Sequence, residues 1–257
     1  MDLGLKGKRV FITASTGGIG LATSEAFLRE GSHVIINGRN EKKLYSEMKR
    51  LKSTYDADVD CVCGDMTKNE DIRAAAEQME AKYGSLDVFV ANLGSGKPES
   101  ENPLEVSEWE RFYDINVVGA VELSNCLHNL LKRGNEPCVT FLSSVVAREA
   151  ALAPVGYAAA KSSVRVFSKY LSRMWVDDGI RVNCVLPGNV YFKGGRWEQL
   201  RDKGPNGVYD YINTAVPMRR FGKPEEIADT ILFLSSRRAG FITGAEIVVD
   251  GGQSVAL

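Results

Sequence analysis

The 257-residue sequence contains few histidines, few cysteines and no long apolar run. The only histidines are His33 and His128, which is too few to favour a histidine-based metal site, and we expect no metal. The five cysteines are odd in number and scattered, which argues against a disulfide framework and predicts reduced, mostly buried thiols. No segment approaches the roughly 18 apolar residues of a membrane span, so we expect no membrane partner.

The sequence also lacks an excess of charge of one sign, with 32 basic and 33 acidic residues and a formal net charge of -1. Such a balance offers no surface suited to a polyanion, so nucleic acid is not an expected partner. The N-terminal residues MDLGLKGKR have no apolar core of the kind found in signal peptides, and we expect a cytoplasmic location. The remaining composition, 44% apolar and 25% charged, is ordinary for a globular protein.

Short apolar segments alternate with amphipathic stretches along the whole chain, without a linker or a break in composition. Two of the helices are predicted to begin at capping boxes, Thr67 with Glu70 and Ser107 with Glu110. Because parallel strands need crossover connections, the alternation predicts one α/β domain over residues 1–257, a doubly wound parallel sheet of about seven strands with helices on both faces. The predicted strands are 9–13, 33–37, 59–63, 86–92, 138–143, 181–186 and 246–249.

The stretch TASTGGIG, residues 13–20, follows the first predicted strand and opens the first helix. Backbone N–H groups and the helix dipole at such a turn can face a pyrophosphate, although a tight strand-to-helix turn would use the same glycines. The spacing departs from GxGxxG, and Ala14 stands where a TGxxxGxG pattern has glycine. A second glycine segment, GSGK at 94–97, lacks the first glycine and the final Ser or Thr of a P-loop, which disfavours ATP chemistry.

The second predicted strand ends in NGRN, residues 37–40, with Arg39 and no carboxylate before Glu41. In dinucleotide folds an acidic residue here binds the ribose hydroxyls, whereas a nearby arginine accommodates a 2'-phosphate. The segment therefore favours NADP(H) over NAD(H), with NAD(H) still possible. The alternative is that Arg39 is an ordinary surface charge.

Tyr157 and Lys161, in YAAAK, are four residues apart and would share one helix face. An adjacent ammonium favours a phenolate, so we expect Lys161 to lower the pKa of Tyr157 toward the working pH of an acid–base catalyst. An exposed pair on a surface helix is the alternative for an isolated YxxxK motif.

Several motifs occur together in one order: TASTGGIG, ANLG, DIN, a serine thirteen residues before YAAAK, VNCVLPG and FITGAEIVVDGG. In this order and spacing the chain resembles the short-chain dehydrogenase/reductase family from Lys8 to Gly252. The segment PMRRFGKPEEIA at 217–228 is most similar to the 3-oxoacyl-(acyl carrier protein) reductase type. The resemblance implies a Rossmann-type fold and an NAD(P)-dependent oxidoreductase that transfers hydride between the cofactor and a small-molecule carbonyl or secondary alcohol.

The resemblance also implies roles for individual residues. Ser144 matches the serine that hydrogen-bonds the substrate oxygen, with Ser143 as second choice. Tyr157 matches the general acid–base residue, and Lys161 matches the lysine that lowers the tyrosine pKa and binds the nicotinamide ribose. Asn116 matches the asparagine near a proton-relay water. The implied cofactor-binding residues are Thr13, Ser15, Thr16, Gly18, Ile19, Gly20, Asn37, Arg39, Asp65, Met66, Asn92, Gly94, Tyr157, Lys161, Pro187, Gly188 and Val190.

The substrate is less defined by the sequence. Residues 191–216 match a segment that forms a lid over the substrate in this family, and their aromatic and basic residues suit either a polar or anionic substrate or an ordinary packed helix. Phe192 replaces a family threonine that binds the nicotinamide carboxamide. The expected substrate-binding residues are Ser144, Tyr157, Arg148, Asn189 and Trp197.

Three functions remain open from the sequence. The first is an NADPH-dependent reductase of a 3-oxoacyl thioester or related ketone, and the second is a dehydrogenase of a sugar or polyol. The third is a non-catalytic cofactor-binding scaffold or redox sensor. By resemblance we also expect a homo-oligomer, a tetramer or a dimer.

Overall fold

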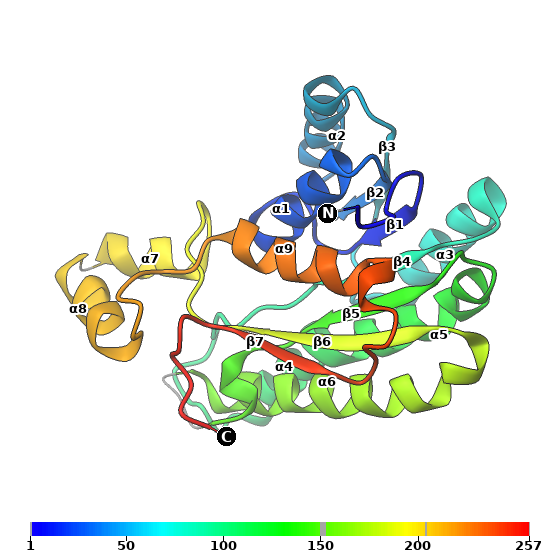
Figure 1. Ribbon diagram of the computed structural model, residues 1–257. Coiled ribbons are helices and arrows are strands. Elements are labelled where there is room, and N and C mark those ends of the chain that lie inside the picture. Colours follow the sequence, from blue (N-terminus) through cyan, green and yellow to red (C-terminus); the bar gives the residue numbers. More distant parts are fainter. Residues whose placement is uncertain (1, 150–152, 204, 257) are drawn as a thin grey trace.

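The strands form because apolar segments are buried on both faces of one sheet. In the computed structural model, which describes residues 2–149, 153–203 and 205–256, every residue of β4 and β5 is buried. All pairings are parallel, in the order β3-β2-β1-β4-β5-β6-β7 (Figure 1). This arrangement confirms the predicted doubly wound sheet. The strands are β1 Arg9–Ile12, β2 His33–Gly38, β3 Val59–Cys63, β4 Val88–Ala91, β5 Cys138–Leu142, β6 Arg181–Pro187 and β7 Glu246–Val249.

Helices cover both faces of the sheet. On one face the core includes Ala22 of α1, Leu44 of α2 and Ile227 of α9. On the other it includes Leu127 of α5 and Val164 of α6, together with residues of α3. The main helices are α1 Gly18–Arg29, α2 Glu41–Tyr55, α3 Asn69–Tyr83, α4 Val106–Tyr113, α5 Gly119–Lys132, α6 Val155–Met174, α7 Arg196–Lys203, α8 Pro205–Ala215 and α9 Pro224–Ser235. Short turns of helix are η1 Asp114–Val118, η2 Val145–Ala147, η3 Val176–Asp178 and η4 Arg237–Ala239.

A row of phenylalanines links the central strands below the site. Phe11 of β1 stacks on Phe89 of β4 with ring centroids 5.9 Å apart, and Phe89 meets Phe141 of β5 edge-on at 6.5 Å. Phe167 of α6 completes the row at 5.5 Å from Phe141. All three strand residues are fully buried, so this row fixes the relative positions of the strands on either side of the β1–β4 switch point.

Both predicted capping boxes are wrong. Helix α3 begins at Asn69 with Lys68 as N-cap, because the Thr67 hydroxyl instead donates to Asp65 Oδ1 at 2.8 Å. Helix α4 begins at Val106, and the Ser107 hydroxyl donates to the side chain of Glu105. In each case a carboxylate two residues upstream is a nearer acceptor than the predicted partner.

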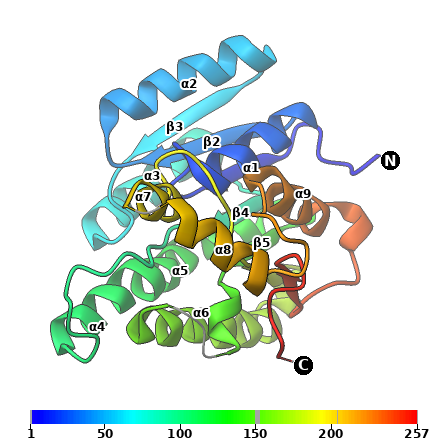
Figure 2. The same ribbon diagram turned by 90° about the vertical axis from the view of Figure 1, so that its left-hand side faces the viewer.

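Helices α7 and α8 lie apart from the sheet layers, over the carboxyl ends of the strands (Figures 1 and 2). Over the part of the chain described here, no helix is both long enough and apolar enough to cross a membrane. The five cysteines are free thiols, as predicted, but Cys63 is exposed. The prediction of mostly buried thiols is therefore correct only in part.

Candidate active site

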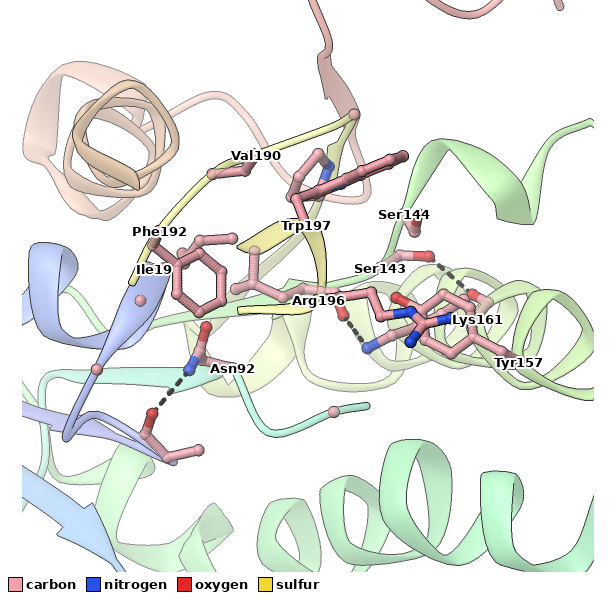
Figure 3. A pocket seen from close by; sticks show the side chains of 17 residues that line it. Ile19, Asn92, Ser143, Ser144, Tyr157, Lys161, Val190, Phe192, Arg196 and Trp197 are labelled. Atoms are coloured by element: carbon pink, nitrogen blue, oxygen red, sulfur yellow. Dashed lines mark hydrogen bonds between the residues drawn. The ribbon is translucent and has the colours of Figure 1, made fainter. Parts of the chain in front are cut away.

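A cavity of about 360 Å³ opens at the carboxyl ends of the strands, where a doubly wound sheet binds its ligands (Figure 3). It brings together the glycine turn, the YAAAK helix, the segment after β6 and the start of α7. Its lining residues are Ala14, Gly17, Gly18, Ile19, Asn92, Gly94, Leu142, Ser143, Ser144, Tyr157, Lys161, Pro187, Gly188, Val190, Phe192, Arg196 and Trp197. Eleven of these are predicted site residues: Gly18, Ile19, Asn92, Gly94, Ser144, Tyr157, Lys161, Pro187, Gly188, Val190 and Trp197.

The glycine turn is held from the end of β4. The side-chain amide of Asn92 donates to the carbonyl oxygens of Thr13 at 2.9 Å and Ala14 at 3.3 Å. A Cβ atom on Gly20 would lie 2.5 Å from the Asn92 amide nitrogen, so this close approach requires glycine. Ala14 has φ of 50°, in the left-handed region that favours glycine. The methyl group is thus accommodated at the cost of backbone strain.

The turn fits a dinucleotide. Gly17 is the N-cap of α1 and supplies no side-chain cap, which leaves the first N–H groups of the helix available to phosphate oxygens beside the cavity. At Gly94 an added Cβ would lie 2.7 Å from both Lys161 Nζ and Asn116 Oδ1. Glycine at this position therefore lets the backbone pass directly beside the lysine.

Tyr157 and Ser144 meet at one end of the cavity. Tyr157 lies in the first turn of α6, and Ser144 is the second residue after β5. Burial raises the pKa of Tyr157 to about 12, and the hydrogen-bonded Ser144 side chain opposes this rise. The expectation that Lys161 lowers the pKa of Tyr157 is not met in this structure, because the effect of burial dominates and the lysine contributes no lowering.

Lys161 is buried one turn further along α6, with 4% of its surface exposed. Its ammonium donates to the Leu142 carbonyl at 2.8 Å and lies 5.9 Å from the centroid of the Tyr157 ring. Burial lowers the pKa of Lys161 to about 8. The Ser143 hydroxyl donates to the Lys161 carbonyl at 2.8 Å, so Ser143 anchors the helix and Ser144 is the serine that faces the tyrosine.

Asn116 lies beside the cavity, in the π-helical turn η1 between α4 and α5. Its amide donates to the carbonyls of Phe112 at 2.9 Å and Ser95 at 3.1 Å, and its Oδ1 accepts from the Ser95 N–H at 3.1 Å. These bonds fix the segment after β4, which passes Tyr157 at Gly96. A Cβ on Gly96 would lie 3.1 Å from the Tyr157 ring.

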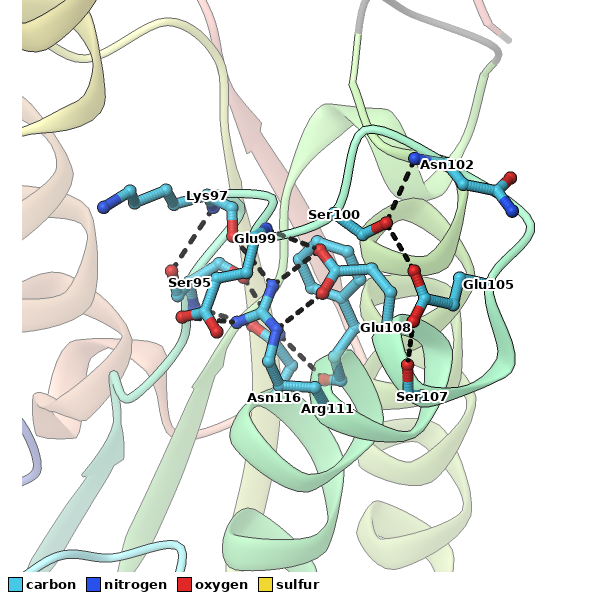
Figure 4. A network of polar contacts seen from close by, with 11 residues as sticks. Ser95, Lys97, Glu99, Ser100, Asn102, Glu105, Ser107, Glu108, Arg111 and Asn116 are labelled. Carbon is cyan, nitrogen blue, oxygen red and sulfur yellow. Dashed lines mark hydrogen bonds and ion pairs between the residues drawn. The ribbon is translucent and has the colours of Figure 1, made fainter.

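The same segment is fixed a second time by a charged pair (Figure 4). Glu108 of α4 is buried, accepts from the Glu99 N–H at 2.9 Å and pairs with Arg111 at 2.7 Å. Arg111 in turn donates to the Lys97 carbonyl at 2.8 Å. The Arg111 guanidinium lowers the pKa of Glu108 to about 2, so the pair stays charged at neutral pH.

Several predicted cofactor residues support the turn and do not line the cavity. Ser15 Oγ donates to the Ile12 carbonyl and accepts from the Asn37 N–H at 2.8 Å. Asn37 Oδ1 accepts from the Ala14 N–H, and its amide donates to the Val62 carbonyl. The structure likewise keeps Thr13, Thr16, Gly20 and Met66 outside the lining, with the Met66 side chain in the core.

Arg39 and Asp65 lie together beyond the ends of β2 and β3. The Arg39 guanidinium is 3.8 Å from Asp65 Oδ2 and its side chain is 82% exposed. Asp65 Oδ1 accepts from the Thr67 N–H and hydroxyl, so this carboxylate also shapes the start of α3. A 2'-phosphate at the end of β2 would find a solvent-accessible cation there.

Two predicted substrate residues lie elsewhere. Asn189 lines a second cavity of about 310 Å³ with Arg220, Glu226 and Asp250, and its carbonyl accepts from the Gly222 N–H at 2.9 Å, while its neighbours Gly188 and Val190 line the active-site cavity. Arg148 is partly buried and does not line the active-site cavity. Leu142 contributes an apolar wall and carries no motif signal, and Gly17 belongs to the TASTGGIG turn but was not among the individual residues expected to bind the cofactor.

The segment 191–216 is packed through aromatic rings. Trp197 stacks on Tyr211 at 5.6 Å and contacts Phe221 at 5.3 Å, and Tyr191 lies 5.6 Å from Phe221. The Phe192 ring covers the glycine turn, since a Cβ on Gly18 would lie 2.8 Å from it. The aromatic residues thus serve packing as well as lining the cavity.

Comparison with known proteins decides the family. A family model described as "Enoyl-(Acyl carrier protein) reductase" matches residues 13–254. The chain belongs to the short-chain dehydrogenase/reductase family. This confirms the predicted family, and the protein is an oxidoreductase.

Relatives of this short-chain dehydrogenase/reductase act on different substrates. Glucose 1-dehydrogenase of Gluconobacter oxydans (strain 621H) is 32% identical over 97% of this chain and 92% of the relative. The 3-oxoacyl-[acyl-carrier-protein] reductase of Chlamydia muridarum is 30% identical over 97% of this chain and 98% of the relative. The crystal structure of L-sorbose reductase from Gluconobacter frateurii, complexed with NADPH and L-sorbose, has 29% identity and a TM-score of 0.92, with 100% of each chain covered.

Proposed function

We propose that this oxidoreductase uses NADPH to reduce a 3-oxoacyl compound or a related ketone to a secondary alcohol. The observation that supports this most directly is the convergence of Ser144, Tyr157 and Lys161 with the glycine turn in one cavity. When bound, the cofactor supplies hydride, and the protein's part is to orient it and stabilise charge on one oxygen. The glycine turn, Gly94, Lys161 and the segment 187–190 would hold it.

Ser144 and Tyr157 are the groups we assign to the substrate oxygen. Two hydroxyl donors converging on a ketone oxygen stabilise the negative charge that develops during reduction. A phenol with a pKa of about 12 holds its proton at neutral pH and can give it to an alkoxide, which suits the reductive direction. We assign to Lys161 the binding of the nicotinamide ribose, and to Asn116 the positioning of the loop beside Lys161.

The preference for NADPH rests on Arg39, which stands at the end of β2 where no carboxylate precedes it. The L-sorbose reductase complex with NADPH is consistent with this choice.

A second candidate is a sugar or polyol dehydrogenase. The likeness to L-sorbose reductase and to glucose 1-dehydrogenase favours it. In both cases we propose that 191–216 is the lid of the substrate site, with Trp197 at its inner surface.

A panel assay separates the candidates. NADPH absorbance is followed with acetoacetyl thioesters, simple ketones and sugars, and oxidation of sugars is followed with NADP⁺. We expect turnover of the keto compounds, and a decrease of at least about a hundredfold in Tyr157→Phe with NADPH binding retained. Turnover of sugars alone would transfer the assignment to the second candidate, and cofactor binding without any turnover would favour a scaffold.

We also propose that the protein forms a homo-oligomer. The edge strand β7 is only partly buried at all four positions, and Phe241 just before it is fully exposed. An apolar sheet edge of this kind is suited to an interface between copies. Light scattering in solution measures the state directly.

A further inference from the structure

We propose that the substrate carries an anionic oxygen group, a carboxylate or a phosphate, and that Arg196 binds it. The inference rests on the proposed function and adds to it the charge of the molecule that is reduced. Among the residues that the structure describes, the cavity lining contains two cations, Lys161 and Arg196, and no carboxylate.

The two cations differ in their partners. Lys161 is buried and its ammonium is bound to the Leu142 carbonyl, so it is held in place by the protein itself. Arg196 is exposed, and within the described ranges it has no ion pair or hydrogen bond from its side chain. Arg220, by contrast, is paired with Glu226 at 2.7 Å. An unpaired guanidinium that shares its cavity with no carboxylate of the described residues attracts anions.

The Arg196 side chain points toward the reacting end of the cavity. In Figure 3 its side chain extends across the cavity toward Tyr157 and Lys161, away from Ile19 and Phe192 at the glycine turn. A cation for the cofactor pyrophosphate would be expected at that other end, beside the N-terminus of α1. The position of Arg196 therefore suits a group on the substrate.

The start of α7 is also well anchored. Trp197, the next residue, is held between Tyr211 and Phe221 by ring contacts of 5.6 and 5.3 Å. The backbone of Arg196 is thus positioned by its neighbour, and only the side chain needs to order on binding. A guanidinium presents parallel N–H donors that match the two oxygens of a carboxylate or phosphate.

The test uses oxo acids paired with their carboxamides, which have nearly the same shape and lack the charge. The probes are acetoacetate, 4-oxopentanoate and 5-oxohexanoate with the three matching amides, and dihydroxyacetone phosphate with dihydroxyacetone. Binding to the NADP⁺-saturated protein is measured by calorimetry, and kcat/KM is measured with NADPH. The variants are Arg196→Gln and, as a matched control, Lys193→Gln, an exposed cation of the same segment that does not line the cavity.

We expect at least one anionic probe to bind about tenfold more tightly than its neutral partner. This ratio is at the lower end of the range of affinity gains for a hydrogen bond to a charged group, because Arg196 is exposed. This preference should disappear in Arg196→Gln and persist in Lys193→Gln. The phosphate and carboxylate pairs show which oxygen group fits.

Three results would overturn the inference. One is equal binding of all charged and neutral partners by the wild type, and another is a preference for the anion that survives in Arg196→Gln. The third is a loss of NADPH affinity in Arg196→Gln with the substrate preference unchanged, which would assign the arginine to the cofactor. Turnover of neutral ketones that depends on Tyr157 would leave the proposed reductase function intact in all three cases.

Discussion

Replacing Ala14 by glycine should stabilise the protein. Ala14 has φ of 50°, and its conformation is fixed on both sides, by the N–H bond to Asn37 at 3.0 Å and by the Asn92 amide on its carbonyl. The left-handed region costs a non-glycine residue about 1–2 kcal/mol. Glycine loses more backbone entropy on folding, which costs about 0.5–1 kcal/mol, so the free energy of unfolding should rise by about 0.5–1 kcal/mol in total. For a chain of this length that corresponds to a rise in Tm of about 2 °C.

The assay is urea unfolding of the wild type and of Ala14→Gly, monitored by circular dichroism in the same buffer without NADPH. The matched control is Ala74→Gly, which makes the same chemical change at an exposed position inside α3, where glycine should cost about 1 kcal/mol. The two variants are therefore expected to move the unfolding midpoint in opposite directions. A decrease in Ala14→Gly as large as that in Ala74→Gly would refute the reasoning from backbone strain.

Two further predictions concern charges near the site. Arg39→Gln should weaken NADPH binding by about tenfold and leave NADH binding nearly unchanged, because only NADPH carries the 2'-phosphate. The control is Lys42→Gln, which removes an exposed cation three residues away and should change neither affinity. Fluorescence titration with both cofactors measures the affinities, and equal losses for NADPH and NADH would contradict the assignment. The pKa of Lys161 is lowered to about 8 in the folded state, so between about pH 8 and pH 10 the unfolded chain binds one proton more than the folded protein. The free energy of unfolding of the wild type should therefore rise with pH relative to that of Lys161→Met. Urea unfolding of both proteins at pH 7 and pH 9.5 tests the sign, and an unchanged difference between them would show that the lysine is not desolvated.

The sheet and most of the cavity could be predicted because their signals are local. Apolar segments that alternate with amphipathic stretches predict a parallel sheet without knowledge of which strands pair. The carboxyl ends of parallel strands then share one edge. The four-residue spacing of Tyr157 and Lys161 places both on one face of α6, and both line the cavity as expected. The glycine turn reaches the same cavity because it follows β1, beside the switch point.

The errors arise where the outcome depends on three-dimensional surroundings. The pKa of Tyr157 is raised by burial, with no lowering from Lys161, and burial is not visible in a spacing of four residues. Asn189 is two residues beyond Pro187, yet it lines a different cavity, and its carbonyl accepts from the Gly222 N–H. The hydrogen bonds of Thr67 and Ser107 were decided by carboxylates that a capping pattern does not include.

The wall of the cavity formed by the segment after β4 is held by its backbone. Asn116 binds the N–H and carbonyl of Ser95, Arg111 binds the carbonyl of Lys97 and Glu108 binds the N–H of Glu99. None of these bonds uses a side chain of the segment itself. The exposed side chains of Lys97 and Glu99 can therefore be exchanged with little change in the path of the chain past Tyr157, whereas Gly94 and Gly96 leave no room for a Cβ. This makes the exposed positions of the segment a natural place for substrate selectivity to diverge, or to be redesigned, on an unchanged catalytic scaffold.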